Sequence, residues 1–188
     1  MQVNKAEDLM VPINQYPIVD SLATVLDAVI RLEESRRTSE SGKQPFQAVL
    51  VADKNGKIIG KLGQMALLRA LEPRSYVVDD QDALNRAGVG DSIMETALSH
   101  YRALQRELPE MCLGAAALPV RFIMIPFKEH IDVATPICEV IHKILEWQTL
   151  SVLVTDRDQP VGLVRLVDLG DEVMKQIRQT ANSANFED

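Results

Sequence analysis

The sequence predicts an α+β fold built from two similar halves, and three observations support this prediction. A short apolar segment ending in Met-x-Pro occurs twice, at residues 10–12 and 124–126. Each copy is followed by a short irregular stretch and a helix with one apolar face, and then by two apolar strands joined by a turn. A second amphipathic helix closes each half. Because each helix has a single apolar face, both helices of a half are expected to lie on a sheet.

Length and composition fit one or two globular domains. The 188 residues are 46% hydrophobic and 25% charged, with a formal net charge of −7. A chain of this length can bury roughly 70% of the surface that its unfolded form exposes, so it needs no disulfide or structural metal. An acidic chain lacks the positive surface that binding to a phosphate backbone requires, so no nucleic acid partner is expected.

The location of the protein is predicted from its apolar segments and its cysteines. No window approaches the roughly 18 consecutive apolar residues of a membrane span, so we expect a cytoplasmic protein without membrane contact. Cys112 and Cys138 lack metal-ligand spacing, and we expect both thiols to be buried, as suits a reducing compartment. Glu139, His142 and Glu146 share a helical face, which we interpret as solvated rather than as a metal site.

The first half begins with a strand that should end at Pro12, because proline cannot donate a ladder hydrogen bond. Asp20 or Ser21 can cap the helix that follows, whose apolar residues recur at helical spacing from Val25. The polar stretch at residues 35–44 has the composition of a mobile loop.

The strand pair of the first half is predicted at residues 46–52 and 57–62, around an Asp-Lys-Asn-Gly turn. Residues 48–52 are almost continuously apolar, which indicates a strand buried on both faces. Gly60, and its counterpart Gly162 in the second half, indicate places where another group approaches the backbone closely. The closing helix is expected over about residues 64–71.

The second half repeats this order. Thr135 and Pro136 are expected to start its first helix. Its strands are predicted at residues 151–155 and 160–164, joined by a tight turn. The closing helix begins near Leu166 and is expected to fray into a polar tail.

A segment between the halves belongs to neither. A capping box at residues 92–95 predicts a helix over residues 93–108 that ends at Pro109. The acidic loop before it lacks the ligand pattern of a cation site and is interpreted as a solvated turn. The predicted organisation is a first repeat at residues 1–74, a helical insert or linker at 75–118, a second repeat at 119–179 and a flexible tail at 180–188.

The Met-x-Pro strand end, the helix, the strand pair with a late glycine and the closing helix, occurring twice, resemble the tandem cystathionine-β-synthase (CBS) domain pair, or Bateman module. The resemblance covers roughly residues 5–72 and 120–178. It implies two β-α-β-β-α repeats related by pseudo-twofold symmetry, with ligand clefts where their sheets meet. It also implies a non-catalytic receptor for AMP, ADP, ATP, S-adenosylmethionine or sometimes a dinucleotide, which regulates a partner protein or a fused domain.

The resemblance further implies where a ligand would bind. After the late glycine, the family pattern has a Ser or Thr that faces phosphate, and three positions later an Asp that accepts hydrogen bonds from both ribose hydroxyls. The first half has Gly63 and Ala66 at these positions, so its cleft lacks the sugar clamp. The second half keeps Asp168 and has Arg165 in place of the hydroxyl. One of the two sites therefore retains part of the pattern.

Each candidate residue has an alternative role. Asp168 is expected in the first turn of a helix, where it can accept ribose hydroxyls or cap the helix. Arg165 can pair with phosphate, lie exposed at the strand end, or plug the cleft with its bulk. Met124 and Ile125 would form an apolar wall against adenine, or pack in the core.

The sequence contains no nucleophile elbow, Walker loop, dinucleotide fingerprint or zinc-ligand pattern, so we predict no enzyme, no metal and no cofactor. The leading hypothesis is a stand-alone regulatory module that senses an adenine nucleotide or S-adenosylmethionine. The alternative is an interaction or scaffold module with vestigial nucleotide sites, whose inserted helix docks a partner protein. A homodimer is expected in addition, because two apolar-faced helices per repeat exceed what one small sheet covers.

Overall fold

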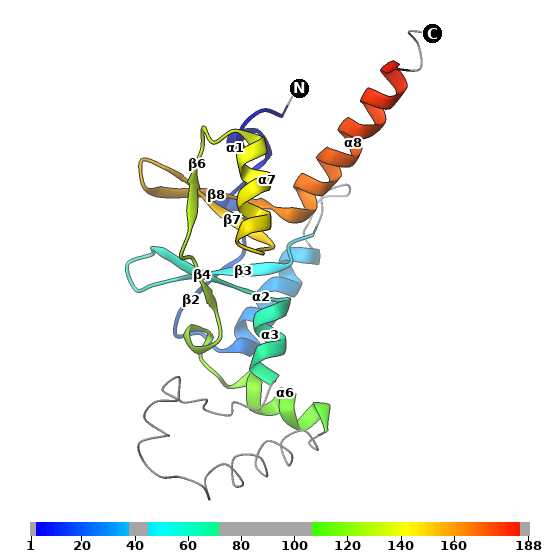
Figure 1. The fold of residues 1–188 in the computed structure, drawn as a ribbon. Coiled ribbons are helices and arrows are strands. Elements are labelled where there is room, and N and C mark those ends of the chain that lie inside the picture. The colour runs from blue at the N-terminus through cyan, green and yellow to red at the C-terminus, as the bar shows by residue number, and fades with distance from the viewer. Residues whose placement is uncertain (1–2, 38–44, 72–106, 185–188) are drawn as a thin grey trace, which may run out of the picture.

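The computed structural model describes residues 3–37, 45–71 and 107–184 (Figure 1). The strands are β1 (Val11–Pro12), β2 (Ile18–Asp20), β3 (Ala48–Ala52), β4 (Ile58–Gly63), β5 (Ile125–Pro126), β6 (His130–Asp132), β7 (Ser151–Asp156) and β8 (Gln159–Arg165). The α-helices are α1 (Ala6–Leu9), α2 (Val25–Arg37), α3 (Gln64–Leu71), α6 (Leu108–Ala116), α7 (Ile137–Glu146) and α8 (Leu166–Ala184).

In these ranges the strands form two four-stranded sheets, and each sheet contains strands from both halves of the chain. One sheet has the order β2-β3-β4-β5, and the other has the order β1-β8-β7-β6. The first half of the chain thus contributes β1 to the second sheet, and the second half contributes β5 to the first sheet. The predicted α+β fold with two repeats related by pseudo-twofold symmetry is confirmed.

β2 and β6 lie in the stretches that the sequence predicts to be irregular. Each is three residues long and pairs in parallel with the central strand of its sheet, β2 with β3 and β6 with β7. So short a strand shows too few alternations of apolar and polar residues to be recognised, and its pairing partner is distant in sequence.

The strand exchange explains the two late glycines. A Cβ placed on Gly60 would lie 2.7 Å from the backbone oxygen of Ile125 and 3.0 Å from Met124 Sδ. A Cβ placed on Gly162 would lie 2.7 Å from Met10 Sδ. The predicted close approach at both glycines is confirmed, and the approaching group is the Met-x-Pro segment of the other half.

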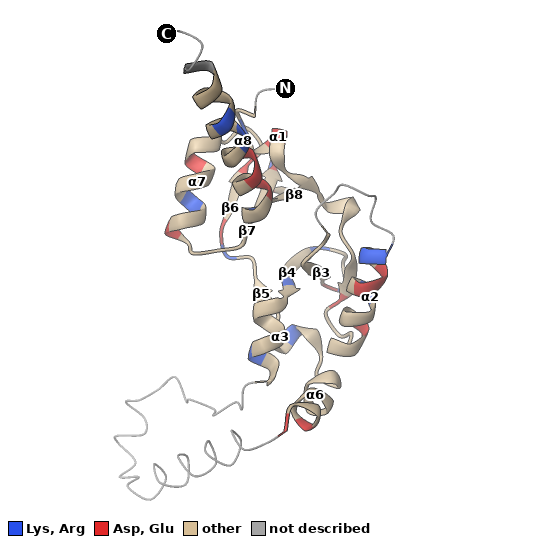
Figure 2. Cartoon of the chain, turned by 90° about the vertical axis from the view of Figure 1, so that its right-hand side faces the viewer, with Lys and Arg blue, Asp and Glu red and all other residues tan. Residues whose placement is uncertain are grey.

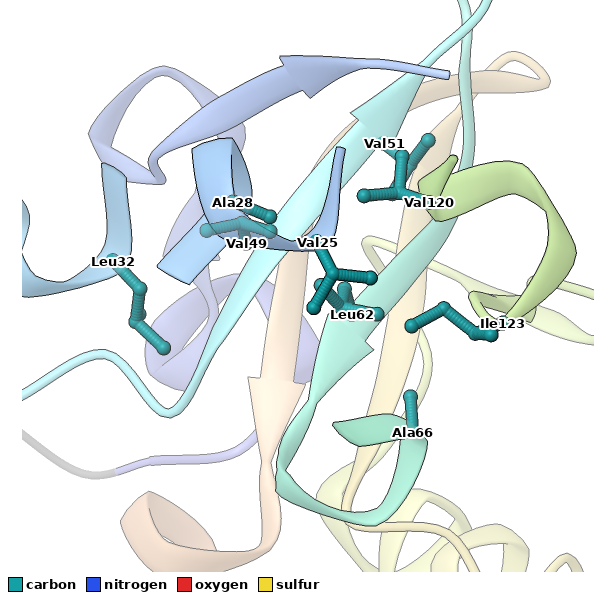
Figure 3. Packing of buried hydrophobic residues seen from close by; sticks show 9 residues of the cluster. All are labelled: Val25, Ala28, Leu32, Val49, Val51, Leu62, Ala66, Val120 and Ile123. Atoms are coloured by element: carbon teal, nitrogen blue, oxygen red, sulfur yellow. The ribbon is translucent and has the colours of Figure 1, made fainter. Parts of the chain in front are cut away.

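Helices α2 and α3 cover the outer face of the first sheet together with the segment that leads into β5 (Figure 3). Val25 N donates a hydrogen bond to Leu118 O at 2.9 Å, and Val120 N donates to Ala23 O at 2.8 Å. Residues from the start of the second predicted repeat therefore complete the core of the first. The buried members of this core are Val25, Ala28, Leu32, Val49, Val51, Leu62, Ala66, Val120 and Ile123.

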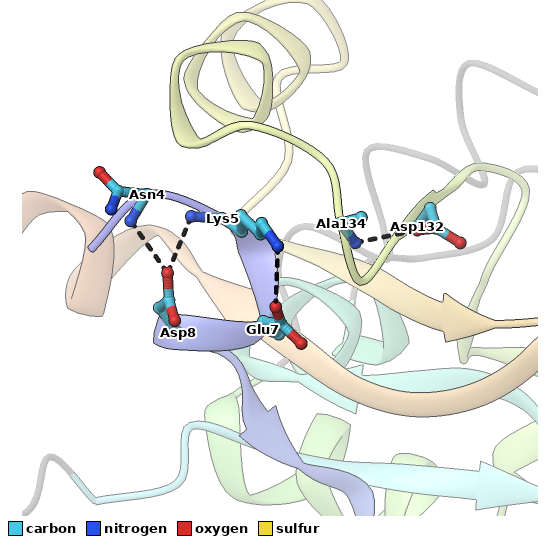
Figure 4. Close-up of polar contacts among 6 residues, drawn as sticks. All are labelled: Asn4, Lys5, Glu7, Asp8, Asp132 and Ala134. Carbon is cyan, nitrogen blue, oxygen red and sulfur yellow. Dashed lines mark hydrogen bonds and ion pairs between the residues drawn. The ribbon is translucent and has the colours of Figure 1, made fainter. Parts of the chain in front are cut away.

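The N-terminal helix α1 makes the equivalent contribution to the second sheet, beside α7. Ala6 N donates to Thr135 O at 2.9 Å, and Ala6 is fully buried against the core of this sheet. The Asp8 carboxylate accepts hydrogen bonds from the backbone N–H groups of Asn4 and Lys5, at 2.9 and 3.0 Å (Figure 4). These bonds lower the pKa of Asp8 and fix the start of α1.

A third core lies where the inner faces of the two sheets meet. β3 supplies Leu50 and Ala52 to it, while Val49 and Val51 point to the outer core. The predicted burial of this strand on both faces is confirmed. The buried members of the inner core are Tyr16, Leu50, Ala52, Ile58, Leu153 and Leu163.

The predicted cap of α2 is wrong. The helix starts after Thr24, whose N–H donates to Asp27 Oδ2 at 2.9 Å while Asp27 N donates to Thr24 Oγ1 at 3.2 Å. Asp20 is the last residue of β2, and its carboxylate accepts from Leu22 N at 2.7 Å within the turn. Asp20 and Ser21 are therefore used in the turn that separates strand from helix.

Three helix ends also differ from prediction. α2 continues through Arg37, so the loop predicted at residues 35–44 begins later. Pro109 lies in the first turn of α6 and starts a helix rather than ending one, because its fixed φ suits a first turn. α8 continues to Ala184, into the segment predicted to be a flexible tail. The helix predicted over residues 93–108 and the acidic loop before it lie almost wholly outside the described residues.

The prediction that both thiols are buried is wrong. Cys112 on α6 and Cys138 on α7 are free and exposed. Glu139, His142 and Glu146 are exposed along α7, which confirms the solvated face, and acidic and basic residues alternate there (Figure 2).

In the described ranges, no group of His, Cys, Asp or Glu is arranged to hold a metal. No helix described there is both long and apolar enough to span a bilayer.

Candidate functional site

Arg165 and Asp168 form an ion pair at the junction of β8 and α8. Arg165 is the last residue of β8, and Asp168 lies in the first turn of α8. Arg165 Nε donates to Asp168 Oδ2, and Arg165 Nη2 donates to Oδ1 at 2.6 Å. The two side chains are only 11% and 17% exposed. One guanidinium thus engages both oxygens of a largely buried carboxylate, which is the strongest geometry for such a pair.

This arrangement narrows the roles left open for Arg165. An exposed position at the strand end is excluded by its burial. Burial opposes the charge of the guanidinium, but the hydrogen bonds and the attraction from Asp168 raise its pKa above the usual value. Arg165 is therefore a permanent cation that holds the carboxylate expected to bind ribose.

Tyr16 lies beside the ion pair. It follows the short helix of residues 13–15, and its ring packs on Phe46 with the ring centroids 4.7 Å apart. The guanidinium carbon of Arg165 lies 5.9 Å from the centroid of the Phe46 ring. Burial raises the pKa of Tyr16 well above its usual value, and the charges of Arg165 and Asp168 act on it in opposite directions. We call Tyr16, Phe46, Arg165 and Asp168 the Arg165 site.

The hydroxyl of Tyr16 is the unusual feature of this site. Tyr16 is 7% exposed, and in the part of the chain that the structure describes its Oη is the one buried side-chain oxygen or nitrogen without a hydrogen-bond partner. Leaving a buried polar group unpaired costs about 1–3 kcal/mol. A group that supplied a hydrogen-bond partner to Tyr16 Oη would remove this cost.

A buried lysine, apart from the Arg165 site, joins the two sheets. Lys61 on β4 is 8% exposed, and its Nζ donates to Ser151 Oγ at 2.6 Å, to Ser151 O at 3.0 Å and to Thr149 Oγ1 at 3.4 Å. The ammonium also lies 5.6 Å from the centroid of the Phe127 ring. Burial lowers the pKa of Lys61 to about 8. Because Ser151 begins β7 of the opposite sheet, Lys61 is a polar tether between the sheets.

The four residues that the sequence predicts as ligand-binding fall into two separate groups. Arg165 and Asp168 are in contact. Met124 and Ile125 lie on the other sheet, where Ile125 pairs with Lys61 and both pack against the outer core. The reason is the strand exchange, because β5 belongs to the second half of the sequence but joins the first sheet. Met124 and Ile125 thus pack against the core, and their part in a wall against adenine stays a prediction.

Sequence reasoning missed Tyr16, Phe46 and Lys61 as members of polar sites. Tyr16 and Phe46 give no local signal, because an aromatic residue beside a strand is ordinary core material. Lys61 does give one, since it is a charged residue between Gly60 and Leu62 in an otherwise apolar strand. A lone lysine in such a strand predicts a buried cation with a specific partner.

Comparisons with known proteins identify the fold. No protein-family model matches the chain, and a search of the curated proteins found no match. Among solved structures, CBSX2 in complex with AMP is similar with a TM-score of 0.59 and 19% identity, over 93% of this chain and 98% of that chain. The CBS-domain containing protein ATU1752 from Agrobacterium tumefaciens gives a TM-score of 0.56 and 13% identity, over 90% of this chain and 93% of that chain.

The cytosolic domain of the Mg2+ channel MgtE in complex with ATP is also similar. Its TM-score is 0.52 at 17% identity, over 89% of this chain and 48% of that chain. These matches extend over nearly all of the chain. With its two repeats and its two sheets completed by exchanged strands, the chain has the fold of a tandem CBS-domain pair.

Proposed function

We propose that this chain is a non-catalytic regulatory module that senses an adenosine-containing ligand at the Arg165 site. The observation that carries this proposal is the unpartnered Oη of Tyr16, buried next to a guanidinium and a carboxylate. Adenosine offers hydrogen-bonding atoms for Tyr16, two ribose hydroxyls for Asp168 and a flat purine for the ring of Phe46. A single ligand of this class would engage Tyr16, Phe46 and Asp168.

The similar structures support a ligand of this class. CBSX2 was crystallised with AMP, and the cytosolic domain of MgtE was crystallised with ATP. The chain shares their fold across both repeats. An adenine nucleotide is therefore the first ligand to test, with S-adenosylmethionine as the second.

The test is a calorimetric titration of the protein with AMP, ADP, ATP and S-adenosylmethionine, with Tyr16→Phe as a matched variant. We expect at least one of these compounds to bind and to raise Tm, because a ligand of the native state stabilises it. Tyr16→Phe removes only the hydroxyl, so it should weaken binding while leaving the unliganded protein at least as stable. No heat and no change in Tm at millimolar concentration of all four compounds would exclude the proposal.

The second candidate function is an interaction module with vestigial nucleotide sites. It is favoured by Gly63 and Ala66, which supply neither hydroxyl nor carboxylate, and by the engagement of Asp168 with Arg165. In that case the ion pair is a permanent structural element. The same titration separates the two functions, since a vestigial site binds none of the compounds.

We also propose that two copies associate through α8. An apolar stripe on this helix is exposed, and the C-terminal half of the helix extends away from both sheets (Figure 1). Its members recur at helical spacing, so they face the same way. We define the α8 stripe as Leu166, Val173, Met174 and Ile177.

The proposed regulatory function includes a partner protein that the module regulates and a cytoplasmic location. The free, exposed thiols of Cys112 and Cys138 suit the reducing conditions of that compartment.

A further inference from the structure

We infer that Ser151 is a nucleophile that accepts acyl groups from activated esters, and that Lys61 is its general base. The two side chains meet between the inner faces of the two sheets, where Lys61 Nζ and Ser151 Oγ are 2.6 Å apart. Neither residue belongs to the Arg165 site. The inference therefore goes beyond the proposed function, because it concerns one covalent modification of the chain itself rather than reversible binding.

The contact between Lys61 and Ser151 has the geometry that activates a serine. A serine hydroxyl becomes nucleophilic when a base within hydrogen-bond reach accepts its proton, and a third group commonly orients that base. Thr149 is the third group, since its Oγ1 lies 3.4 Å from Lys61 Nζ and donates to Ser151 O at 3.0 Å. Ser151 O also accepts from Nζ at 3.0 Å. Three oxygens thus hold the amine in place, and its shortest contact is with Ser151 Oγ.

Lysine acts as a base only when its amine is neutral, and the surroundings of Lys61 favour the neutral form. Lys61 is 8% exposed, and no carboxylate among the residues that the structure describes pairs with it. Burial without an opposite charge lowers the pKa of Lys61 to about 8. At that pH about half of the amine is neutral. In the neutral form the hydrogen bond reverses, so that Ser151 Oγ donates its proton to Nζ.

The two side chains differ in exposure as the chemistry requires. Lys61 is shielded from water, whereas Ser151 and Thr149 are partly exposed and Leu150 between them is 62% exposed. An acyl compound can therefore approach the serine while the base stays buried. The ring of Phe127, whose centroid lies 5.6 Å from Lys61 Nζ, borders the pair and suits a small acyl group such as acetyl.

The covalent step is a single acyl transfer. The neutral amine of Lys61 takes the proton of Ser151 Oγ while this oxygen attacks the carbonyl carbon of the ester. A bond forms between Oγ and the carbonyl carbon, and the bond from that carbon to the leaving oxygen breaks. The products are an ester on Ser151, a protonated Lys61 and the anion of the leaving group. Atoms and charge therefore balance, and the activated ester is the only co-reactant.

The experiment treats the wild-type protein with p-nitrophenyl acetate. Absorbance follows the release of p-nitrophenolate, and peptide mass spectrometry locates the acetyl group. We expect a burst of p-nitrophenolate and an acetyl ester on Ser151. After subtraction of spontaneous hydrolysis, the burst rate should rise roughly tenfold per pH unit below the pKa of Lys61 and level off above it, because the neutral amine is the base. An acetyl group on Lys61 instead of Ser151, or on neither residue, would overturn the inference.

Two variants test the roles of the pair. Ser151→Ala should abolish acetylation at this position, and Lys61→Met should slow the burst at least about a hundredfold, the lower range for loss of a general base. Ser35→Ala and Lys57→Met are the matched controls, since Ser35 Oγ donates to Leu32 O at 2.7 Å and Lys57 is exposed in a turn. Both controls should be acetylated at Ser151 as fast as wild type.

The wild-type measurements decide even if a variant fails to fold. Circular dichroism shows whether Ser151→Ala and Lys61→Met are folded, and the peptide map and the pH profile of wild type need neither variant. An acetylated Ser151 whose rate follows no ionisation near pH 8 would remove Lys61 from the role of base and overturn the inference. A folded Lys61→Met variant that is acetylated as fast as wild type would do the same. None of these outcomes bears on nucleotide binding, so the proposed function is tested separately.

Discussion

Two buried cations on the inner faces of the sheets are compensated in different ways. Arg165 meets a carboxylate, which keeps it charged. Lys61 meets the hydroxyl and carbonyl oxygens of Ser151 and the hydroxyl of Thr149. In the described ranges no carboxylate lies within ion-pair distance of Lys61, so its desolvation is not offset by an opposite charge. The buried ammonium of Lys61 therefore lowers the stability of the folded protein, and this effect depends on pH.

Lys61→Met should show this penalty as a pH-dependent difference in stability. The pKa of Lys61 is about 8 in the folded protein, against an ordinary value of 10.5. Between these values the unfolded chain binds more protons, so folding of the wild type becomes more favourable as pH rises. Relative to Lys61→Met, the wild-type free energy of unfolding should rise by up to roughly 3 kcal/mol from pH 8 to pH 10.5. Urea unfolding at several pH values measures this difference.

The exposed turn residue Lys57, changed to Met, is the matched control for loss of a lysine. A difference between wild type and Lys61→Met that stays constant over the same pH range would show that the buried ammonium is not the cause.

At the scale of elements, the glycines and the Met-x-Pro segments hold the exchanged strands in place. Gly60 faces the backbone oxygen of Ile125, which cannot move without shifting β5. At Gly162 the nearest atom belongs to the flexible Met10 side chain, although Val11 O is also only 2.9 Å away. Absence of a side chain at both glycines allows the strands to approach.

Gly60→Ala and Gly162→Ala should both destabilise the protein, by about 1–3 kcal/mol, as overpacking does in a close-packed core. The larger effect is expected at Gly60, because its neighbour is backbone. Gly114→Ala is the control, since a Cβ there meets nothing within 4 Å and alanine favours helix α6. It should stabilise by roughly 0.5–1 kcal/mol. Denaturant unfolding of the three variants checks the order, and a Gly60→Ala variant as stable as wild type would contradict the proposed role.

The elements with a strong local pattern could be predicted from the sequence. α3 was expected over the residues it occupies, and Arg157 and Asp158 form the predicted tight turn with positive φ at both positions. The exchange of β1 and β5 could not be predicted, because nothing local to a two-residue strand indicates its distant partner. The ion pair of Arg165 and Asp168 is local in sequence, but the neighbouring Tyr16 reaches it only through the exchanged β1.

At the scale of the molecule, the α8 stripe is the exposed apolar surface most suited to a second copy. Ile177 is 63% exposed. It lies in the C-terminal half of α8, the half that extends beyond the sheets (Figure 1). Glu172 and Lys175 pair with each other on another side of the helix, at 2.9 Å. Glu172 and Lys175 thus satisfy each other within one chain, whereas the apolar residues of the α8 stripe remain exposed.

Ile177→Glu should convert a dimer into a monomer, because it places a charge in the apolar contact. Asn182→Glu, on the opposite side of α8, adds the same charge outside the stripe and should leave the dimer intact. Light scattering coupled to size exclusion at micromolar concentration gives the mass of each. A wild-type protein that is monomeric under these conditions would argue against association through α8.

The exchange of β1 and β5 also bears on how such a chain could have arisen. One repeat alone would have a three-stranded sheet with an open edge beside its glycine, and only another repeat could fill it. An ancestral single-repeat protein would therefore have met this need by trading strands between two identical subunits. Joining two such subunits in one polypeptide would keep the same exchange and would let the halves differ, as they do here in their buried cations, Lys61 in one and Arg165 in the other.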